Sequence, residues 1–108
     1  MYKATIVYGH PTDPKEFDRH YREVHIPLAK GMPNLLAWTI TWLERGLDGV
    51  EPDAYLIAEL YCATREDLQA AFESDAGRAA AADVEVFATG GVSMSFGPVT
   101  DVLAAEAT

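Results

Sequence analysis

Residues 13–33 read DPKEFDRHYREVHIPLAKGMP, and the rest of the chain can be interpreted around this stretch. It begins as a helix does: Asp13 suits the N-cap, Pro14 suits the first helical position, and Glu16 completes a capping box. Apolar side chains then recur at helical spacing and predict one core-facing stripe, made of Phe17, Tyr21, Val24 and Leu28. We therefore expect a helix that packs on one face of a small sheet.

The end of this helix carries the sharpest chemical feature of the sequence. Pro27 has no N–H to donate to the carbonyl of Glu23, and it biases Ile26 away from helical angles, so we expect the helix to be interrupted there. His25 would then lie in the last regular turn, beside carbonyls without partners. A helix C-terminus favours an imidazolium, which makes His25 a candidate cationic or proton-donating group. The alternative is that His25 only donates hydrogen bonds to the carbonyls that Pro27 frees.

Length and charge limit the classes of protein that the chain can represent. Its 108 residues and 49% hydrophobic content fit one domain over residues 1–108 with a real core. The net charge is −9, which disfavours nucleic acid and anionic membranes as partners. The charge is uneven, because from residue 51 onward eleven acidic residues face only Arg65 and Arg78. We interpret this half as a solvated, solubilising surface.

The cysteine count bears on the cellular compartment. Cys62 is the only cysteine, so no disulfide can form within the chain, and a reducing compartment fits. No basic segment precedes a long apolar run, and we expect neither a signal peptide nor a membrane span. The sequence therefore predicts a cytoplasmic protein.

The order of the remaining patterns predicts the fold class. Strand-like alternation covers residues 2–8, 35–43, 54–62 and 92–99, and residues 45–53 read as the loop of a hairpin. A second helical region begins at Thr64, breaks at Ser74-Asp75 and continues toward Phe87. The order strand-helix-strand, strand-helix-strand is that of the ferredoxin-like βαββαβ fold, an α+β class with a four-stranded antiparallel sheet and helices on one face.

The two middle strands predict self-association. A sheet covered by helices on one side normally alternates apolar with polar residues, yet residues 35–43 and 54–62 are apolar or aromatic on both sides. One assigned side of the second of these strands holds Tyr55, Ile57, Glu59 and Tyr61. Because an exposed apolar face is unusual on a monomer, we expect a homodimer in which two sheets meet.

A set of residues in the first third of the chain resembles the signature of EthD-domain proteins, which belong to the dimeric α+β barrel superfamily. The residues that carry the resemblance are Tyr8, Pro11, Asp13-Pro14, Phe17, Tyr21, His25, Pro27-Leu28 and Pro33. The resemblance implies two four-stranded sheets that face each other as a barrel, with the helices outside. It also implies a ligand pocket between sheet and helices in each subunit. Relatives in the wider superfamily include polyketide cyclases, cofactor-free monooxygenases, lactone isomerases and haem enzymes.

The candidate site is centred on His25. The resemblance to EthD proteins implies that this histidine faces the pocket. Such a group can protonate or polarise a substrate carbonyl, or exchange a proton next to one, which makes it the candidate catalytic residue. Tyr21 lies one turn earlier on the same helical face. Tyr8 ends the first strand, so it could bring a second hydroxyl to the opening of the same pocket. Both tyrosines also suit the core. Trp38 and Phe72 are further candidates for lining an apolar or aromatic cavity, although most aromatic residues belong to the core and the dimer interface.

Glu59 is the one acidic residue on an apolar strand face, where a charge is costly without a partner. It could be paired at the dimer interface, with Arg45 or Lys3. The other possibility is a carboxylate of raised pKa that lines the pocket. Glu59 therefore joins the candidate substrate-binding residues.

The motifs of metal and nucleotide sites do not occur. His10 falls in a turn, and His20 lies near the polar side of the helix, five residues before His25, which is not the i,i+4 spacing of zinc-binding helical pairs. No GxGxxG, GxxxxGK or GxSxG motif is present. We expect no metal and no cofactor.

These patterns lead to one function hypothesis and two alternatives. We expect a cytoplasmic homodimer that binds an apolar or aromatic metabolite and promotes proton transfer, as in cyclisation, isomerisation or decarboxylation, with His25 as acid or base. The first alternative is a non-catalytic ligand-binding accessory protein of an oxygenase system. The second is a cofactor-free or haem-assisted oxidoreductase.

Overall fold

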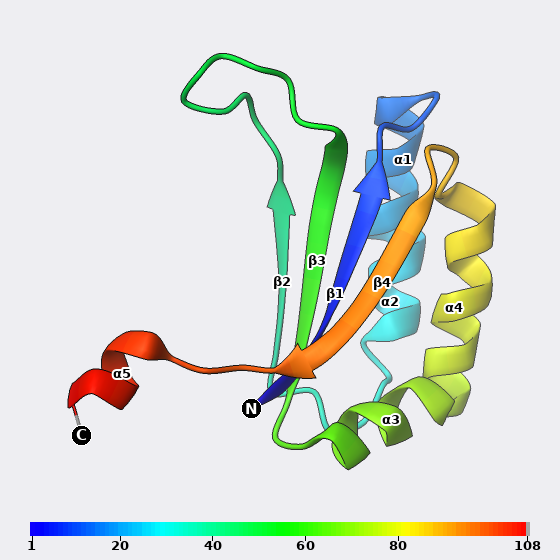
Figure 1. Ribbon diagram of the computed structural model, residues 1–108. Helices are drawn as coiled ribbons and strands as arrows, with labels where there is room; N and C mark the ends of the chain where they lie inside the picture. Colours follow the sequence, from blue (N-terminus) through cyan, green and yellow to red (C-terminus); the bar gives the residue numbers. More distant parts are fainter. Residues whose placement is uncertain (108) are drawn as a thin grey trace.

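The computed structural model describes residues 1–107, which form one sheet, one layer of helices on it and a short last helix that lies apart from both (Figure 1). The elements in chain order are β1 (Tyr2–Gly9), α1 (Pro14–His20), η1 (Tyr21–His25), α2 (Ile26–Ala29), β2 (Ala37–Trp42), β3 (Ala54–Cys62), α3 (Arg65–Glu73), α4 (Asp75–Phe87), β4 (Val92–Pro98) and α5 (Val102–Ala107). Among these described residues, no helix is both long enough and apolar enough to cross a membrane.

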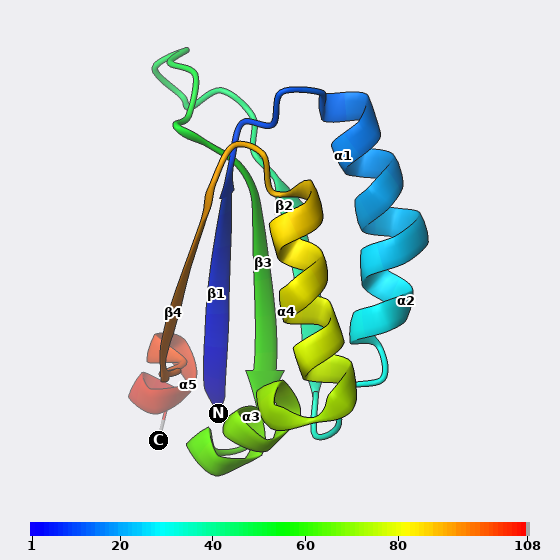
Figure 2. The ribbon, with the colours of Figure 1, turned by 90° about the vertical axis from the view of Figure 1, so that its right-hand side faces the viewer.

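The sheet has the predicted topology. Its strand order is β2-β3-β1-β4, and all three pairings are antiparallel. The helices from α1 to α4 all cover the same face, and the opposite face is bare (Figure 2). This arrangement confirms the expected α+β fold with a ferredoxin-like order of elements. The buried core lies between the two layers and includes Ile6, Tyr8, Leu56 and Leu60.

The helix that begins at Pro14 is not interrupted at Pro27, so that expectation is wrong. Asp13 caps it as predicted, accepting the Glu16 N–H at 3.2 Å. The π-helical turn η1 then lets the Ile26 N–H donate to the carbonyl of Tyr21, five residues back. Pro27 follows within the first two positions of α2, where a missing N–H costs little. The chain thus stays helical to Ala29, and His25 lies inside the helix instead of at its end.

The π turn also changes which side chains face the core. The buried residues are Phe17, Tyr21, His25 and Ala29, whereas the predicted stripe member Leu28 is exposed. In a regular α-helix, three steps of four residues would drift by about 120° around the axis. The π turn takes back part of this drift, because its i→i+5 bonding places more residues in one turn and each residue then rotates by less. His25 is therefore held on the core side, in line with Tyr21.

The second helical region breaks and restarts where predicted. Thr64 caps α3 through the Asp67 N–H, and Ser74 caps α4 through the Gly77 N–H at 3.1 Å. Gly77 is required by close packing, because a Cβ there would lie 2.3 Å from the carbonyl oxygen of Ala71. The tight junction turns α4 to run beside η1, with Asp83 and Phe87 on its buried side.

The predicted faces of β3 are wrong at Tyr55, because the strand contains a bulge there. Tyr8 pairs with Leu56 and Gly9 pairs with Ala54, so Tyr55 is the extra residue. The bulge turns the Tyr55 ring to the helix side, where its hydroxyl donates to Asp18 at 2.7 Å. The bare face of the sheet keeps Val7, Ile57 and Tyr61, and these alternate with threonines and serines of the neighbouring strands. That face is therefore mixed, less apolar than the sequence suggested.

Candidate functional site

A small cavity lies between the sheet and the helices, next to the middle of the long helix. Its volume is about 30 Å³, and its polar lining consists of Tyr8, Tyr21, His25 and Trp38. Most of the remaining wall is apolar and comes from both layers: Ile6, Ala29, Met32, Ala58, Leu60 and Val84. We call this space the inner cavity. All four strands supply one side of it, and η1, α2, α3 and α4 supply the other.

Three hydrogen-bond donors around the inner cavity have no partner. The hydroxyls of Tyr8 and Tyr21 and the indole Nε1 of Trp38 are buried without a hydrogen bond to any residue of the described chain. An unsatisfied buried polar group costs about 1–3 kcal/mol, and such groups are rare in folded proteins. Three of them on one cavity indicate a place for a ligand atom that accepts hydrogen bonds.

Burial keeps both phenols protonated. The pKa of Tyr8 is raised well above its usual range, chiefly by burial and further by Tyr21 and the Asp83 carboxylate. Burial raises the pKa of Tyr21 to about 12, and the nearby Trp38 N–H, which approaches the Tyr21 hydroxyl without reaching hydrogen-bond geometry, opposes this shift. Because neither hydroxyl ionises near neutral pH, both can only act as donors or neutral acceptors there. The site therefore offers protonated hydroxyls to a ligand oxygen.

His25 lies beside these donors and is paired with an acid. Its side chain is 6% exposed, and its Nδ1 lies 3.0 Å from Oδ2 of Asp83 on α4. Burial lowers the pKa of His25, while the hydrogen bond and the charge of Asp83 oppose the shift without reversing it. The net shift favours the neutral imidazole over the imidazolium. With its Nδ1–H donated to the carboxylate, Nε2 keeps a lone pair, which is the arrangement of a general base.

Asp83 is the functional residue that sequence reasoning missed. Its two oxygens accept from two histidines, since Oδ1 also lies 2.7 Å from Nε2 of His20. His20, expected near the polar side of the helix, is only 15% exposed. The Phe87 ring lies against both imidazoles, with centroid distances of 5.2 Å to His20 and 4.8 Å to His25. The available signal was an acid on the apolar side of an alanine-rich helix, at core spacing from Ala80 and Phe87.

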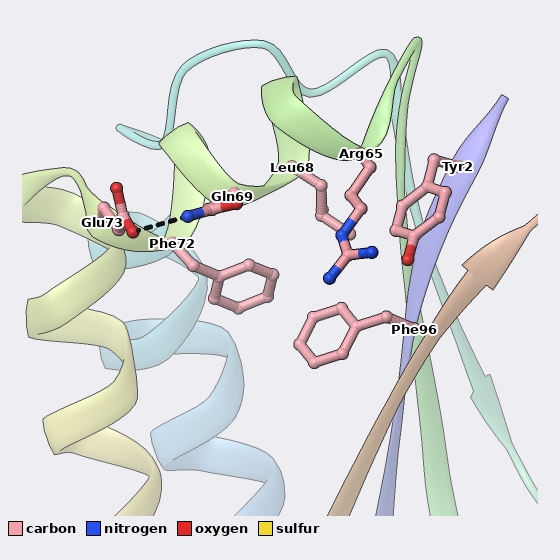
Figure 3. Close-up of a pocket in the computed structure, with 7 residues that line it drawn as sticks. All are labelled: Tyr2, Arg65, Leu68, Gln69, Phe72, Glu73 and Phe96. Atoms are coloured by element: carbon pink, nitrogen blue, oxygen red, sulfur yellow. Dashed lines mark hydrogen bonds between the residues drawn. The ribbon is translucent and has the colours of Figure 1, made fainter.

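A larger space adjoins the inner cavity at the edge of the sheet. It has a volume of about 310 Å³ and lies between α3 and the strands β1 and β4 (Figure 3). We call it the outer chamber; its lining consists of Tyr2, Arg65, Leu68, Gln69, Phe72, Glu73 and Phe96. Phe72 belongs to the walls of both spaces, and its ring meets that of Phe96 edge-on at 5.7 Å. Phe72 thus separates the two.

The structure brings together five of the six residues predicted for the site. Tyr8, Tyr21, His25, Trp38 and Phe72 all line the inner cavity. Glu59 does not join them, because it lies on the bare face of the sheet. There it accepts a 2.6 Å hydrogen bond from Tyr61 and lies 3.6 Å from the Lys3 amine, one of its two predicted partners. Arg45, the other, pairs with Glu51. Within residues 1–107, no three His, Cys, Asp or Glu side chains are grouped as a metal site.

The fold and this site together define a small α+β protein with a buried aromatic pocket that carries a histidine–carboxylate pair. The chain belongs to the EthD family: residues 9–91 match the EthD domain. A curated relative from Rhodococcus erythropolis, described as an uncharacterized 11.0 kDa protein in the thcB-thcC intergenic region, is 45% identical over 96 residues. The match covers 89% of this chain and 92% of the relative. The resemblance seen in the sequence is therefore confirmed.

Solved structures agree on the fold. An EthD family protein from Bacillus halodurans is 32% identical with a TM-score of 0.86, covering 93% of this chain and 99% of that one. SnoaB, a cofactor-independent oxygenase from Streptomyces nogalater, shares the fold with a TM-score of 0.63 at 12% identity, covering 93% and 92% of the two chains. A dimeric ferredoxin-like protein from Thermobifida fusca has a TM-score of 0.67 at 12% identity, with 92% of each chain covered.

Proposed function

We propose that this protein binds an apolar or aromatic metabolite with a carbonyl oxygen and promotes proton transfer next to that carbonyl. The observation that carries the proposal is the meeting of three unpartnered buried donors with a neutral imidazole on one cavity. A ligand oxygen would satisfy the donors, and the surrounding apolar wall would hold the ligand body. A protein that only binds or carries a ligand needs no base, whereas this site has a candidate base, His25, paired with the carboxylate of Asp83.

The reaction begins at the carbon next to the substrate carbonyl. A proton leaves that carbon for Nε2 of His25, and the electron pair of the broken C–H bond moves onto the carbonyl oxygen as an enolate. The hydroxyls of Tyr8 and Tyr21 and the Trp38 N–H stabilise the new negative charge. Asp83 stabilises the imidazolium that forms, since it already accepts the Nδ1–H of His25.

Two outcomes complete the proton transfer. In isomerisation of a β,γ-unsaturated ketone, the enolate is a conjugated dienolate, and the imidazolium returns the proton to its γ-carbon as the double bond moves to the α,β position. In cyclisation, the enolate carbon attacks a second carbonyl of the same molecule, and the imidazolium protonates the resulting alkoxide. Both outcomes leave His25 neutral for the next turnover, as a general base requires.

A second candidate reaction uses the same enolate. The fold that this chain shares with SnoaB, a cofactor-independent oxygenase, favours it. An electron-rich enolate can react with molecular oxygen directly, and the first step would again be proton removal by His25. Consumption of oxygen with substrate would separate this reaction from isomerisation. Haem-assisted chemistry does not fit the inner cavity, because the space that His25 lines has a volume of about 30 Å³, which holds a few water molecules at most.

The size of the inner cavity places the ligand body in the outer chamber. A metabolite larger than water does not fit in about 30 Å³, whereas about 310 Å³ lies within the range of small-molecule sites. Phe72 is the shared wall and is only half-buried. We place the ligand body beside Phe96, with its carbonyl passing Phe72 toward Tyr8 and Tyr21 when the Phe72 ring turns aside.

An exchange experiment tests the proposal without knowledge of the natural substrate. 2-Tetralone is an apolar bicyclic ketone with acidic protons next to its carbonyl, and their replacement by deuterium in D₂O can be followed by NMR. The expected result is exchange much faster than with free imidazole at the same concentration as the protein. Exchange no faster than with imidazole would contradict the proposed proton transfer.

We further propose a homodimer in the cytoplasm. The bare face of the sheet, the assembly of the Thermobifida fusca fold relative and the single, buried Cys62 support it. Light scattering coupled to gel filtration should give about twice the chain mass of 11.8 kDa. Ile57→Lys, on the bare face, should give a folded monomer, whereas Val86→Lys, on the exposed side of α4, should leave the dimer intact. A monomeric wild-type protein at micromolar concentration would rule the dimer out.

A further inference from the structure

We propose that the outer chamber recognises the carboxylate of an aromatic ligand through Arg65. The natural substrate class would then be an aromatic or polycyclic keto acid, with its carboxylate in the outer chamber and its ketone at the inner cavity. The ketone end of this assignment rests on the proposed function. The carboxylate end rests on the outer chamber alone.

The walls of the outer chamber fit a flat apolar ring. Three aromatic side chains line it, Tyr2 from β1, Phe72 from α3 and Phe96 from β4, and Leu68 is a further apolar contact. Phe96 is 53% exposed although it lies on the helix side of the sheet, because the helices leave the edge strand β4 uncovered (Figure 2). A ring placed between Phe72 and Phe96 would cover this apolar surface.

Arg65 brings a positive charge to this apolar space. Its guanidinium extends toward the chamber between the rings of Tyr2 and Phe96 (Figure 3). Among the side chains of residues 1–104 it has neither an ion pair nor a side-chain hydrogen bond, although the chain has 17 acidic residues. The carboxylate of the same chamber, Glu73, already accepts a hydrogen bond from Gln69 at 3.1 Å. The chamber thus offers a free cation beside aromatic rings.

The position of Arg65 in its helix is unfavourable. Arg65 is the first residue of α3, and a positive charge at a helix N-terminus opposes the helix dipole. The next two residues, Glu66 and Asp67, follow the usual preference for acids in the first turn. A residue that breaks a local rule without local compensation is expected at functional sites. This is a second reason, independent of the chamber, to assign Arg65 a ligand.

The chemistry of the guanidinium indicates a carboxylate. Its planar fork pairs with the two oxygens of a carboxylate, and it also stacks on aromatic faces, which a lysine ammonium does less well. The chamber holds one cation and also Glu73, so it suits a singly charged group better than a phosphate dianion. We therefore commit to a carboxylate on an aromatic body.

Two probes with the same ring test this assignment: 2-naphthoate carries a charged carboxylate, and 2-naphthamide carries a neutral amide in its place. Their binding to the wild-type protein is measured by NMR titration. Naphthoate should bind more tightly than naphthamide and should shift the signals of Gln69 and Phe96. Arg65→Gln should weaken naphthoate binding about tenfold or more and leave naphthamide unchanged. Arg65→Lys should weaken naphthoate binding to an intermediate degree. The matched control is Arg78→Gln, an exposed arginine on α4 outside both cavities, which should bind naphthoate as the wild type does.

Several outcomes would overturn the assignment. These are equal affinity for the two probes, no binding at millimolar naphthoate, an unchanged affinity in Arg65→Gln, or an equal loss in Arg78→Gln. Circular dichroism confirms that each variant is folded. Deuterium exchange of 2-tetralone, which has no carboxylate, is measured on the wild-type protein alongside these titrations. Absence of that exchange with intact naphthoate selectivity would refute the proton transfer and leave the carboxylate site standing.

Discussion

Replacing His25 with glutamine should slow the deuterium exchange of 2-tetralone by about 10²–10⁴-fold, the usual contribution of a positioned general base. Glutamine keeps a polar side chain of similar reach that can still donate to Asp83. It has no nitrogen lone pair to take the substrate proton. Binding of 2-tetralone should change little, because the aromatic walls and the three donors remain. The expected pattern is therefore a loss of rate without a comparable loss of affinity.

The matched control is His10→Gln. His10 is exposed, its Nε2 lies 2.7 Å from the carbonyl oxygen of Pro52, and it lines neither cavity. This variant should exchange 2-tetralone at the wild-type rate. If His25→Gln exchanged within threefold of His10→Gln while remaining folded, His25 would be a structural residue and the proposed chemistry would be wrong.

Asp83→Asn should reduce both stability and exchange rate. The carboxylate accepts from His20 with one oxygen and from His25 with the other, and both are charge-assisted contacts in a buried place. An amide can accept through only one atom, so one imidazole would face an NH₂ group and would have to change its tautomer. We expect a loss of about 2–3 kcal/mol in the free energy of unfolding. We also expect a roughly 10–100-fold slower exchange, as found when a residue that orients a functional histidine is removed.

Glu85→Gln is the control for that variant, because Glu85 lies two residues later on α4 and is exposed. Urea unfolding followed by circular dichroism gives the stability of both variants. Equal unfolding midpoints for Asp83→Asn and Glu85→Gln would show that the two histidine contacts contribute nothing to stability. Equal exchange rates would remove Asp83 from the mechanism.

The fold could be predicted because each of its boundaries has a local cause. Asp13, Thr64 and Ser74 each cap a helix through a side-chain oxygen, and each contact joins residues three positions apart. The strands follow from alternation, and the range Ala54–Cys62 agrees residue for residue. Local rules fail where a residue far away in the sequence determines the local conformation. The Tyr55 bulge is an example, since it depends on the register against Tyr8 and Gly9.

The site was predicted only in part, for the same physical reason. Tyr21 and His25 share a helical face, so their proximity is a local property. Asp83 lies 58 residues beyond His25, and only the packing of α4 against η1 brings the carboxylate to the imidazole. The surroundings of His25 were predicted less well, because Pro27 was expected to end the helix. The π turn instead keeps the helix intact and turns His25 into the core, where burial favours the neutral form.

The π turn therefore links the local sequence to the proposed chemistry. A regular helix interrupted at Pro27 would leave His25 near solvent and near free carbonyls. The continuous helix places it between the aromatic rings of Tyr21 and Phe87, with ring centroids 5.1 and 4.8 Å away, and opposite Asp83. π turns occur often at functional sites, and this one positions the candidate base.

The central claim is that His25 is a neutral base whose Nε2 is free, and ¹⁵N-edited NMR of the histidine side chains tests it most directly. At pH 7 the His25 ring should be neutral, with its proton on Nδ1 and an unprotonated Nε2. Its titration midpoint should lie below the ordinary histidine pKa of 6.5. A His25 ring that is charged at pH 7, or that has its single proton on Nε2, would contradict the account.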